Sequence, residues 1–237
     1  MQQLSLSSKM VRPREVIQSL PISKLNSIRA ALGDSWLVAG TRGSGKTTFA
    51  RMLVYRLLLR FPRSRLYVLD SKIAGDFDGW PGVIQTDWKC PSRPQAKQRV
   101  QVWQPVFIEP EEVETWLDGI LHDGPSILFV DELVSLVYTR NDASMAYARI
   151  LKLGRGLNVG CVTCTQELAG GVPRTIVGQS VQVARFRLQQ PYERRLIDSI
   201  LGVSEKLREP MDQYGFYHLD TRTNGTPAYF DSCQSFF

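Results

Sequence analysis

The feature that most constrains this chain is a glycine-rich octapeptide between an apolar run and an amphipathic segment. Gly40-Thr41-Arg42-Gly43-Ser44-Gly45-Lys46-Thr47 has the spacing G-x-x-x-x-G-K-[ST]. The apolar run at 36–39 before it is typical of a strand buried on both faces. The apolar residues of 46–60 fall on one helical face, and Pro62 ends that helix. The order strand, glycine turn, helix indicates an α/β fold.

The residues of this turn are those that hold phosphate groups. Glycine lets the backbone approach an anion without a Cβ clash, so that successive N–H groups and the helix N-terminus face the phosphate oxygens. Lys46 is expected to reach the β- and γ-phosphates of ATP, and Thr47 to ligate Mg²⁺. The predicted nucleotide-binding residues are Gly40, Thr41, Arg42, Gly43, Ser44, Gly45, Lys46, Thr47 and Thr48.

Two acids follow a second apolar strand. Ile127-Leu128-Phe129-Val130 leads directly into Asp131 and Glu132. The carboxyl ends of parallel strands meet at one edge of a sheet, so both acids are expected beside the glycine loop. Asp131 is predicted to hold Mg²⁺ through water, and Glu132 to activate the attacking water as general base. The alternative is a pair of acids that cap the N-terminus of a helix. An adjacent glutamate favours hydrolysis over phosphoryl transfer to a small molecule.

A third apolar strand, at 158–165, ends in Thr165 and Gln166. A polar residue at that edge can touch the γ-phosphate or the attacking water, which makes Gln166 a candidate catalytic residue. The alternative is an ordinary loop glutamine.

The remaining pattern alternates strands and helices, as expected of a doubly wound, mostly parallel sheet. Further strands are predicted at 65–70, 100–103, 126–130 and 181–188, and further helices at 111–122, 143–153 and 191–201. Gly154 and Gly202 are expected to end the last two helices. A terminal hairpin is predicted from 215–219 and 228–230 across Asn224-Gly225.

Residues 1–34 are interpreted as a helical leader that Pro21 divides, and residues 35–237 as one ATPase domain. No stretch approaches the roughly 20 apolar residues that span a bilayer, and the start lacks a signal-peptide pattern. These observations predict a cytoplasmic protein without a membrane partner. Cys161 and Cys164 are spaced C-x-x-C, but on a strand they point to opposite faces, which favours core packing over metal or redox use.

The formal net charge is +6, which is compatible with a nucleic-acid partner. The basic, proline-containing segment 87–99 is a candidate contact loop. A solvated surface loop is an equally good interpretation.

Together these segments resemble the FtsK–HerA superfamily of DNA-pumping ATPases, which includes viral genome-packaging ATPases. Leu69-Asp70-Ser71-Lys72 with Gly75-Asp76-Phe77 is similar to that family's second-strand signature. Gly154-Arg155-Gly156-Leu157-Asn158-Val159 through Thr165-Gln166 is similar to the family's stretch before and along its sensor strand. The likeness covers about 35–230, and it departs at Ser71, where proline is common, and at Cys164, where alanine is common.

The resemblance implies a RecA-like core and a homo-oligomeric ring, hexameric or pentameric, that hydrolyses ATP with Mg²⁺ and translocates double-stranded DNA. It further implies genome packaging into a capsid, with a capsid or portal partner, in the host cytoplasm or the virion. Arg155 aligns with the family's arginine and is predicted to be an arginine finger that acts across a subunit boundary. Arg149 and Arg140 are the other candidates, and an ordinary exposed arginine paired with an acid is the alternative.

Two other functions stay open. A small-molecule kinase also uses a phosphate-binding loop, and Tyr192-Glu193-Arg194-Arg195 could belong to an arginine-rich lid. A nucleotide-gated assembly or scaffolding protein would bind ATP with little turnover. The combination of Lys46, Asp131 and Glu132 argues against a pure scaffold, because such a protein needs no catalytic set.

Overall fold

The computed structural model describes residues 28–72, 77, 83–87, 90, 99–105, 107–139, 142–167, 178–202, 213–223 and 227–231. Of the two helices expected within 14–32, the described part at 28–32 is not helical, and the rest lies outside the described residues. The turn at Asn224-Gly225 and most of the 87–99 segment also lie outside them.

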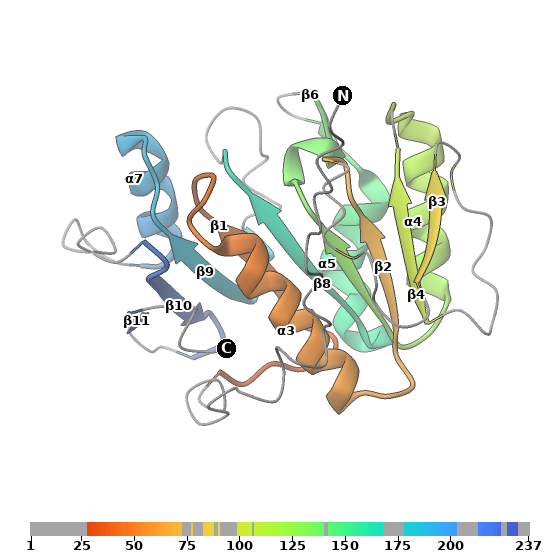
Figure 1. Ribbon diagram of the computed structural model, residues 1–237, viewed down its shortest axis with the longest axis horizontal. Coiled ribbons are helices and arrows are strands. Elements are labelled where there is room, and N and C mark those ends of the chain that lie inside the picture. Colours follow the sequence, from red (N-terminus) through yellow and green to blue (C-terminus); the bar gives the residue numbers. More distant parts are fainter. Residues whose placement is uncertain are drawn as a thin grey trace, which may run out of the picture.

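A nine-stranded sheet forms the centre of the described structure (Figure 1). Its spatial order is β11-β10-β9-β1-β8-β5-β2-β4-β3. All neighbours from β9 to β3 pair in parallel, whereas β10 is antiparallel to β9 and to β11. The strands are β1 (Ser35–Ala39), β2 (Arg65–Leu69), β3 (Val83–Asp87), β4 (Val100–Gln104), β5 (Ser126–Val130), β8 (Val159–Thr165), β9 (Gln182–Phe186), β10 (Phe216–Asp220) and β11 (Ala228–Phe230). The predicted α/β class and the terminal hairpin are confirmed.

Helices cover both faces of the sheet, as Figure 1 shows. The helices are α3 (Lys46–Arg60), α4 (Pro110–His122), α5 (Met145–Leu157) and α7 (Pro191–Ile200). The buried side of α3 packs on one face of the sheet. Buried residues of α4, α5 and α7 pack on the other. A doubly wound arrangement of this kind places the loops that follow the parallel strands together at one edge.

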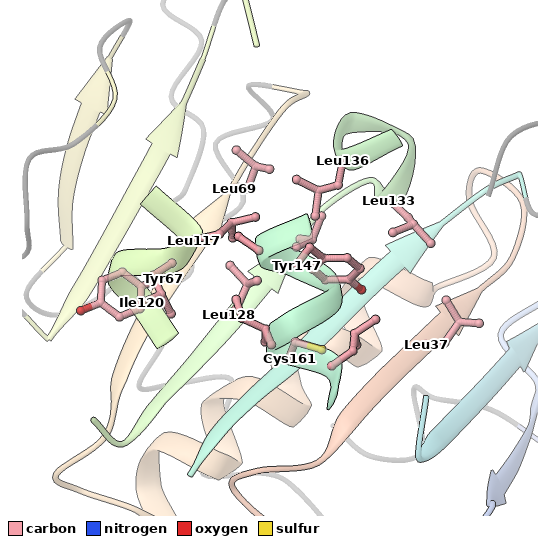
Figure 2. Close-up of a cluster of buried hydrophobic side chains, with 14 of the residues drawn as sticks. Leu37, Tyr67, Leu69, Leu117, Ile120, Leu128, Leu133, Leu136, Tyr147 and Cys161 are labelled. Carbon is pink, nitrogen blue, oxygen red and sulfur yellow. The ribbon is translucent and has the colours of Figure 1, made fainter. Parts of the chain in front are cut away.

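The core divides into two hydrophobic clusters, one on each face of the sheet. Figure 2 shows the cluster beneath α4 and α5, where Leu128 of β5 and Cys161 of β8 lie among leucine and tyrosine side chains. Cys164 belongs to the opposite cluster, against α3. The strand periodicity that separates the two cysteines is therefore confirmed, and both thiols pack as core residues. Burial raises the pKa of Cys161 to about 12, which keeps the thiol protonated.

The described end of the predicted leader packs against the sheet. Ile28 and Leu32 are buried in the cluster around α3. The approach to β8 is close, because a Cβ on Gly160 would lie 1.9 Å from the carbonyl oxygen of Leu32. Residues 28–34 thus share the core of the domain, while the division at 34/35 remains a prediction.

The predicted end of the helix at Gly154 is wrong. Helix α5 continues through Gly154 to Leu157, and Asn158 ends it in the left-handed conformation with φ of 56°. Asparagine is one of the few residues that adopt this conformation at a helix end. Gly154 instead allows close packing, because a Cβ there would lie 2.2 Å from the carbonyl oxygen of Val159.

This difference predicts opposite effects for two glycines of α5. We expect Gly154→Ala to destabilise the fold by about 1–3 kcal/mol, since the methyl group forces the helix away from β8. Gly156 has no atom within 4 Å of a built Cβ, so Gly156→Ala is expected to be neutral or stabilising by up to about 1 kcal/mol. Urea unfolding of the two variants measures the difference, and equal stability would contradict the packing role of Gly154.

Short elements outside the regular alternation were not predicted. β3 is an edge strand in the segment between β2 and β4. A 3-10 turn, η1 (Leu133–Leu136), follows Glu132, and β6 (Val137–Thr139) pairs with β7 (Asp142–Ala143) as a separate hairpin. Strands of two or three residues are too short to show a periodicity in sequence.

Candidate functional site

The loop between β1 and α3 makes a tight turn that is anchored on both sides. The N–H of Gly40 donates to the carbonyl oxygen of Thr165 at 3.1 Å, and the N–H of Thr41 donates to that of Arg187 at 2.9 Å. Gly43 and Gly45 have positive φ values of 76° and 92°. A side chain at either position would strain the turn. The loop is therefore fixed to the ends of β8 and β9, and it leads directly into the first turn of α3.

The N-terminus of α3 is suited to an anion. No side chain caps it, and its first turn contains no acidic residue. The buried hydroxyl of Ser44 has no hydrogen-bond partner among the described residues. Thr47 and Thr48 stand in the first turn, next to Lys46. Unpaired N–H groups at a helix start, together with a buried hydroxyl, fit the oxygens of a phosphate group.

Lys46 supplies positive charge at the same place. The residue is only 5% exposed, and its ammonium makes a long hydrogen bond of 3.4 Å to the carbonyl oxygen of Thr41. Burial lowers the pKa of Lys46, and the nearby ammonium of Lys72 also lowers it, whereas the carboxylates of Glu132 and Asp131 raise it. A buried ammonium whose hydrogen bond within the described residues is long and goes to a neutral carbonyl gains most from a negatively charged ligand.

The two predicted acids lie at the same edge of the sheet. β5 pairs with β8, and β8 pairs with β1, so Asp131 and Glu132 follow a strand two positions from the loop strand. Asp131 is 3% exposed, and its N–H donates to the carbonyl oxygen of Leu69 at 3.1 Å. Glu132 has an extended backbone that begins η1. Neither acid caps an α-helix, in contrast to the alternative interpretation.

Gln166 binds Glu132 with its backbone and its side chain. The N–H of Gln166 donates to Oε1 of Glu132 at 3.1 Å, and its amide Nε2 donates to Oε2 at 3.0 Å. β8 lies between β1, which leads into the glycine loop, and β5, which leads into the two acids. Gln166 at the end of β8 therefore lies between the loop and the acids. The structure thus shows a contact with the predicted base. The predicted contact with a γ-phosphate or a water stays a prediction.

Lys72 is a member of the cluster to which the sequence interpretation gave no role. It follows β2, and its ammonium lies 3.2 Å from Oδ2 of Asp131 and 3.2 Å from Oε2 of Glu132. Burial alone would lower the pKa of Lys72, but the two carboxylates raise it above its usual value. Its place in the Leu69–Lys72 motif was the only signal in sequence, because its partners are set by the pairing of β2 with β5.

The residues present fit a nucleotide with Mg²⁺. The hydroxyl of Thr47 and the carboxylate of Asp131 are oxygen donors, which Mg²⁺ prefers. Among the described residues no cluster of three or more His, Cys, Asp or Glu could hold a metal by itself. Mg²⁺ is usually held by one or two carboxylates together with water and phosphate oxygens.

The three arginines proposed as fingers have different surroundings. Arg155 is exposed in the last turn of α5, just before β8, and therefore lies at the edge of the sheet opposite the glycine loop. Arg149 forms an ion pair of 2.5 Å with Asp118 of α4. Arg140 lies outside the described residues. The structure brings Lys46, Asp131, Glu132 and Gln166 together, and it does not bring Arg155 to them within one chain.

Two other predicted segments include arginines that are bound to the backbone. Arg99, at the end of the 87–99 segment, donates to the carbonyl oxygens of Leu58 and Ser64. Arg194, in the segment considered as a kinase lid, donates to those of Leu188 at 2.8 Å and Gln189 at 3.1 Å. Both side chains therefore hold the fold together, which reduces their availability for DNA or for a substrate.

Comparison with solved structures places the fold among known NTPases. The genome packaging NTPase B204 of Sulfolobus turreted icosahedral virus 2, in complex with AMP, superposes with a TM-score of 0.68 at 16% identity, over 86% of this chain and 99% of that one. The pCW3 conjugation coupling protein TcpA gives 0.57 at 14% identity, over 84% of this chain and 60% of that one. The cytoplasmic domain of the Thermomonospora curvata type VII secretion ATPase EccC gives a TM-score of 0.58 at 20% identity, over 85% of this chain and 25% of that one. Neither a protein-family model nor a curated protein sequence matches the chain.

The parallel sheet, the glycine loop and the acids at its edge have the architecture of a P-loop NTPase. More particularly, the fold is the one found in the viral genome packaging NTPase B204, which shares this architecture over almost its whole length. No helix in the described ranges has the length and apolar character needed to cross a membrane.

Proposed function

We propose that this protein hydrolyses ATP at the edge of the sheet where the glycine loop and the two acids meet. The observation that carries the proposal is the convergence of Lys46, at the start of α3, with Asp131 and a Glu132 held by Gln166. A phosphate-binding loop alone would serve any nucleotide-binding protein. A fixed carboxylate beside it supplies what hydrolysis needs in addition, a base for water.

Each residue of the site has a separate task in this mechanism. The N–H groups of the loop and Lys46 hold the phosphates and stabilise the charge that develops on them. Thr47 and Asp131 would hold Mg²⁺, which when bound neutralises phosphate charge. Glu132 accepts the proton of the attacking water, and Gln166 fixes the direction of its carboxylate.

We further propose that hydrolysis drives translocation of double-stranded DNA by a homo-oligomeric ring, hexameric or pentameric, in viral genome packaging. Support comes from the fold shared with the genome packaging NTPase B204 and with the conjugation coupling protein TcpA. The net charge of +6 agrees with a polyanionic partner. A capsid or portal protein would then be a partner, and the host cytoplasm or the virion the place of action.

The decisive experiment measures phosphate release from ATP with and without double-stranded DNA, together with the particle size in solution. A DNA-translocating ring is expected to release free phosphate faster with DNA and to sediment as an oligomer. A phosphorylated small molecule in place of free phosphate would instead show a kinase. If the protein forms an oligomer and binds ATP but does not hydrolyse it even with DNA present, the result would favour an assembly or scaffolding protein.

DNA binding is expected to be independent of base sequence and sensitive to salt. Contacts to phosphates release counterions, so the logarithm of affinity should fall linearly with the logarithm of salt, with a slope of about −0.9 for each phosphate neutralised on duplex DNA. Fluorescence anisotropy of two unrelated duplexes between low and physiological salt measures this. A flat salt response, or a strong preference for one duplex, would argue against a translocase.

A further inference from the structure

The ammonium of Lys72 lies against the two acids of the site. It lies 3.2 Å from Oδ2 of Asp131 and 3.2 Å from Oε2 of Glu132, and it donates to the carbonyl oxygen of Asp131 at 3.1 Å. One hydrogen bond and two ion pairs thus join this ammonium to both acids. Within the described residues, Lys72 is therefore bound to this pair of acids and not to the glycine loop.

The contacts divide unequally between the oxygens of Glu132. Oε2 forms the ion pair with Lys72 and accepts from Nε2 of Gln166, whereas among the described residues Oε1 accepts only the N–H of Gln166. Each carboxylate oxygen has two lone-pair sites. Oε1 thus keeps one site, which can take a proton from water. Residues at the ends of β2 and β8 hold the carboxylate from two sides and determine which oxygen remains available.

The same ammonium reduces the negative charge of Asp131. Two adjacent carboxylates repel each other, and a shared cation removes that repulsion. The contact is with Oδ2 of Asp131, whose carboxylate would hold Mg²⁺. Two cations close to one carboxylate repel each other, so an ammonium here weakens the binding of the divalent ion.

We propose that Lys72 is a positioning residue with two linked effects: it orients Glu132 for hydrolysis, and it opposes the binding of Mg²⁺ at Asp131. The inference rests on the proposed ATPase function. Its second effect concerns binding, so it can be measured whether or not the protein turns over. If Lys72 only stabilised the fold, its substitution would change neither the Mg²⁺ requirement nor turnover selectively.

The test uses Lys72→Met in the full chain, which keeps the length of the side chain and removes its charge. Binding of a fluorescent, non-hydrolysable ATP analogue is titrated with Mg²⁺. We expect half-saturation at a Mg²⁺ concentration lower by about fivefold or more. The repulsion between two unit charges about 4 Å apart corresponds to a factor of that size even in water. In hydrolysis, kcat is expected to fall by roughly 10- to 100-fold with little change in the KM for ATP.

Two variants serve as matched comparisons. Lys72→Arg restores the charge, so it should return the Mg²⁺ requirement to that of the unchanged protein and recover part of kcat. Lys152→Met removes an exposed lysine of α5 and should change neither quantity. If Lys72→Met fails to fold, Lys72→Gln, which keeps a hydrogen-bond donor without charge, is titrated in its place.

Three outcomes would overturn the proposal. An unchanged or increased Mg²⁺ requirement without the charge would exclude competition at Asp131. Unchanged kcat would exclude orientation of Glu132. A rise in KM alone would identify Lys72 as a phosphate ligand. If the unchanged protein does not hydrolyse ATP at all, the proposed function fails, whereas the Mg²⁺ titration still decides the binding effect of Lys72.

Discussion

Glu132→Gln is expected to slow ATP hydrolysis by about 10²–10⁴-fold and to leave ATP binding nearly unchanged. The amide keeps the shape of the side chain but cannot accept a proton from water. The phosphate-binding groups are on α3 and its loop, and the substitution does not alter them. Single-turnover hydrolysis and equilibrium binding of ATP, measured on the same preparation, separate the two effects.

The structure predicts that this substitution also lowers the stability of the fold. Both oxygens of Glu132 accept hydrogen bonds from Gln166, and Oε2 also forms an ion pair with Lys72. An amide offers one acceptor and one donor group, so at least one of these contacts is lost. Thermal unfolding is therefore measured beside the kinetics. Glu111→Gln, an exposed acid in the first turn of α4, is the control and should keep full activity. Turnover near that of the unchanged protein in Glu132→Gln would falsify the general-base assignment.

The parts of the site that could be predicted are those with local physical causes. A continuous apolar run predicts a strand buried on both faces, as with β5, and a glycine-rich turn before an amphipathic run predicts the phosphate loop. Parallel strands share an edge, so Asp131 could be placed beside Lys46 without knowing the strand order. The bounds predicted for α3 and β5 are confirmed because their end signals, Pro62 and the two acids, are local.

Tertiary contacts account for what could not be predicted. Gly154 was interpreted as a helix end, yet its function is to admit the carbonyl of Val159, a contact that appears only when α5 packs on β8. The role of Lys72 depends on the register that sets Leu69 of β2 opposite Val130 of β5. A single sequence contains no information about either pairing, although Asn158 did offer a local signal for the true helix end.

The second large effect on hydrolysis is expected from substitution of Arg155. The structure limits how this residue can act. Arg155 precedes β8 and the loop follows β1, and these strands are parallel neighbours. The seven residues of β8 span roughly 20 Å, so Arg155 cannot reach the nucleotide of its own chain. A catalytic role of Arg155 would therefore require a neighbouring subunit. Arg155 also has no side-chain partner among the described residues, whereas Arg149 is paired with Asp118.

A mixing experiment tests this arrangement. Arg155→Ala and Lys46→Ala are each expected to lose hydrolysis, the arginine variant by about 10³-fold or more, while Arg155→Ala keeps ATP binding. In a head-to-tail ring assembled from equal amounts of both, about a quarter of the boundaries pair an intact loop with an intact arginine. Hydrolysis should therefore recover to a comparable fraction of the unchanged activity.

The control separates true complementation from simple dilution. In the control, a chain that carries both substitutions is mixed with the Arg155→Ala chain. This mixture contains intact loops but no intact arginine, so its rings should stay inactive. Arg149→Ala should remain active, because its guanidinium already serves the ion pair with Asp118 on the surface between α4 and α5. Full activity of Arg155→Ala alone, or equal turnover in a form shown to be monomeric, would remove Arg155 from the mechanism. Recovery in the mixture would make hydrolysis conditional on assembly, since each nucleotide would then need a residue that its own chain holds at the far edge of the sheet.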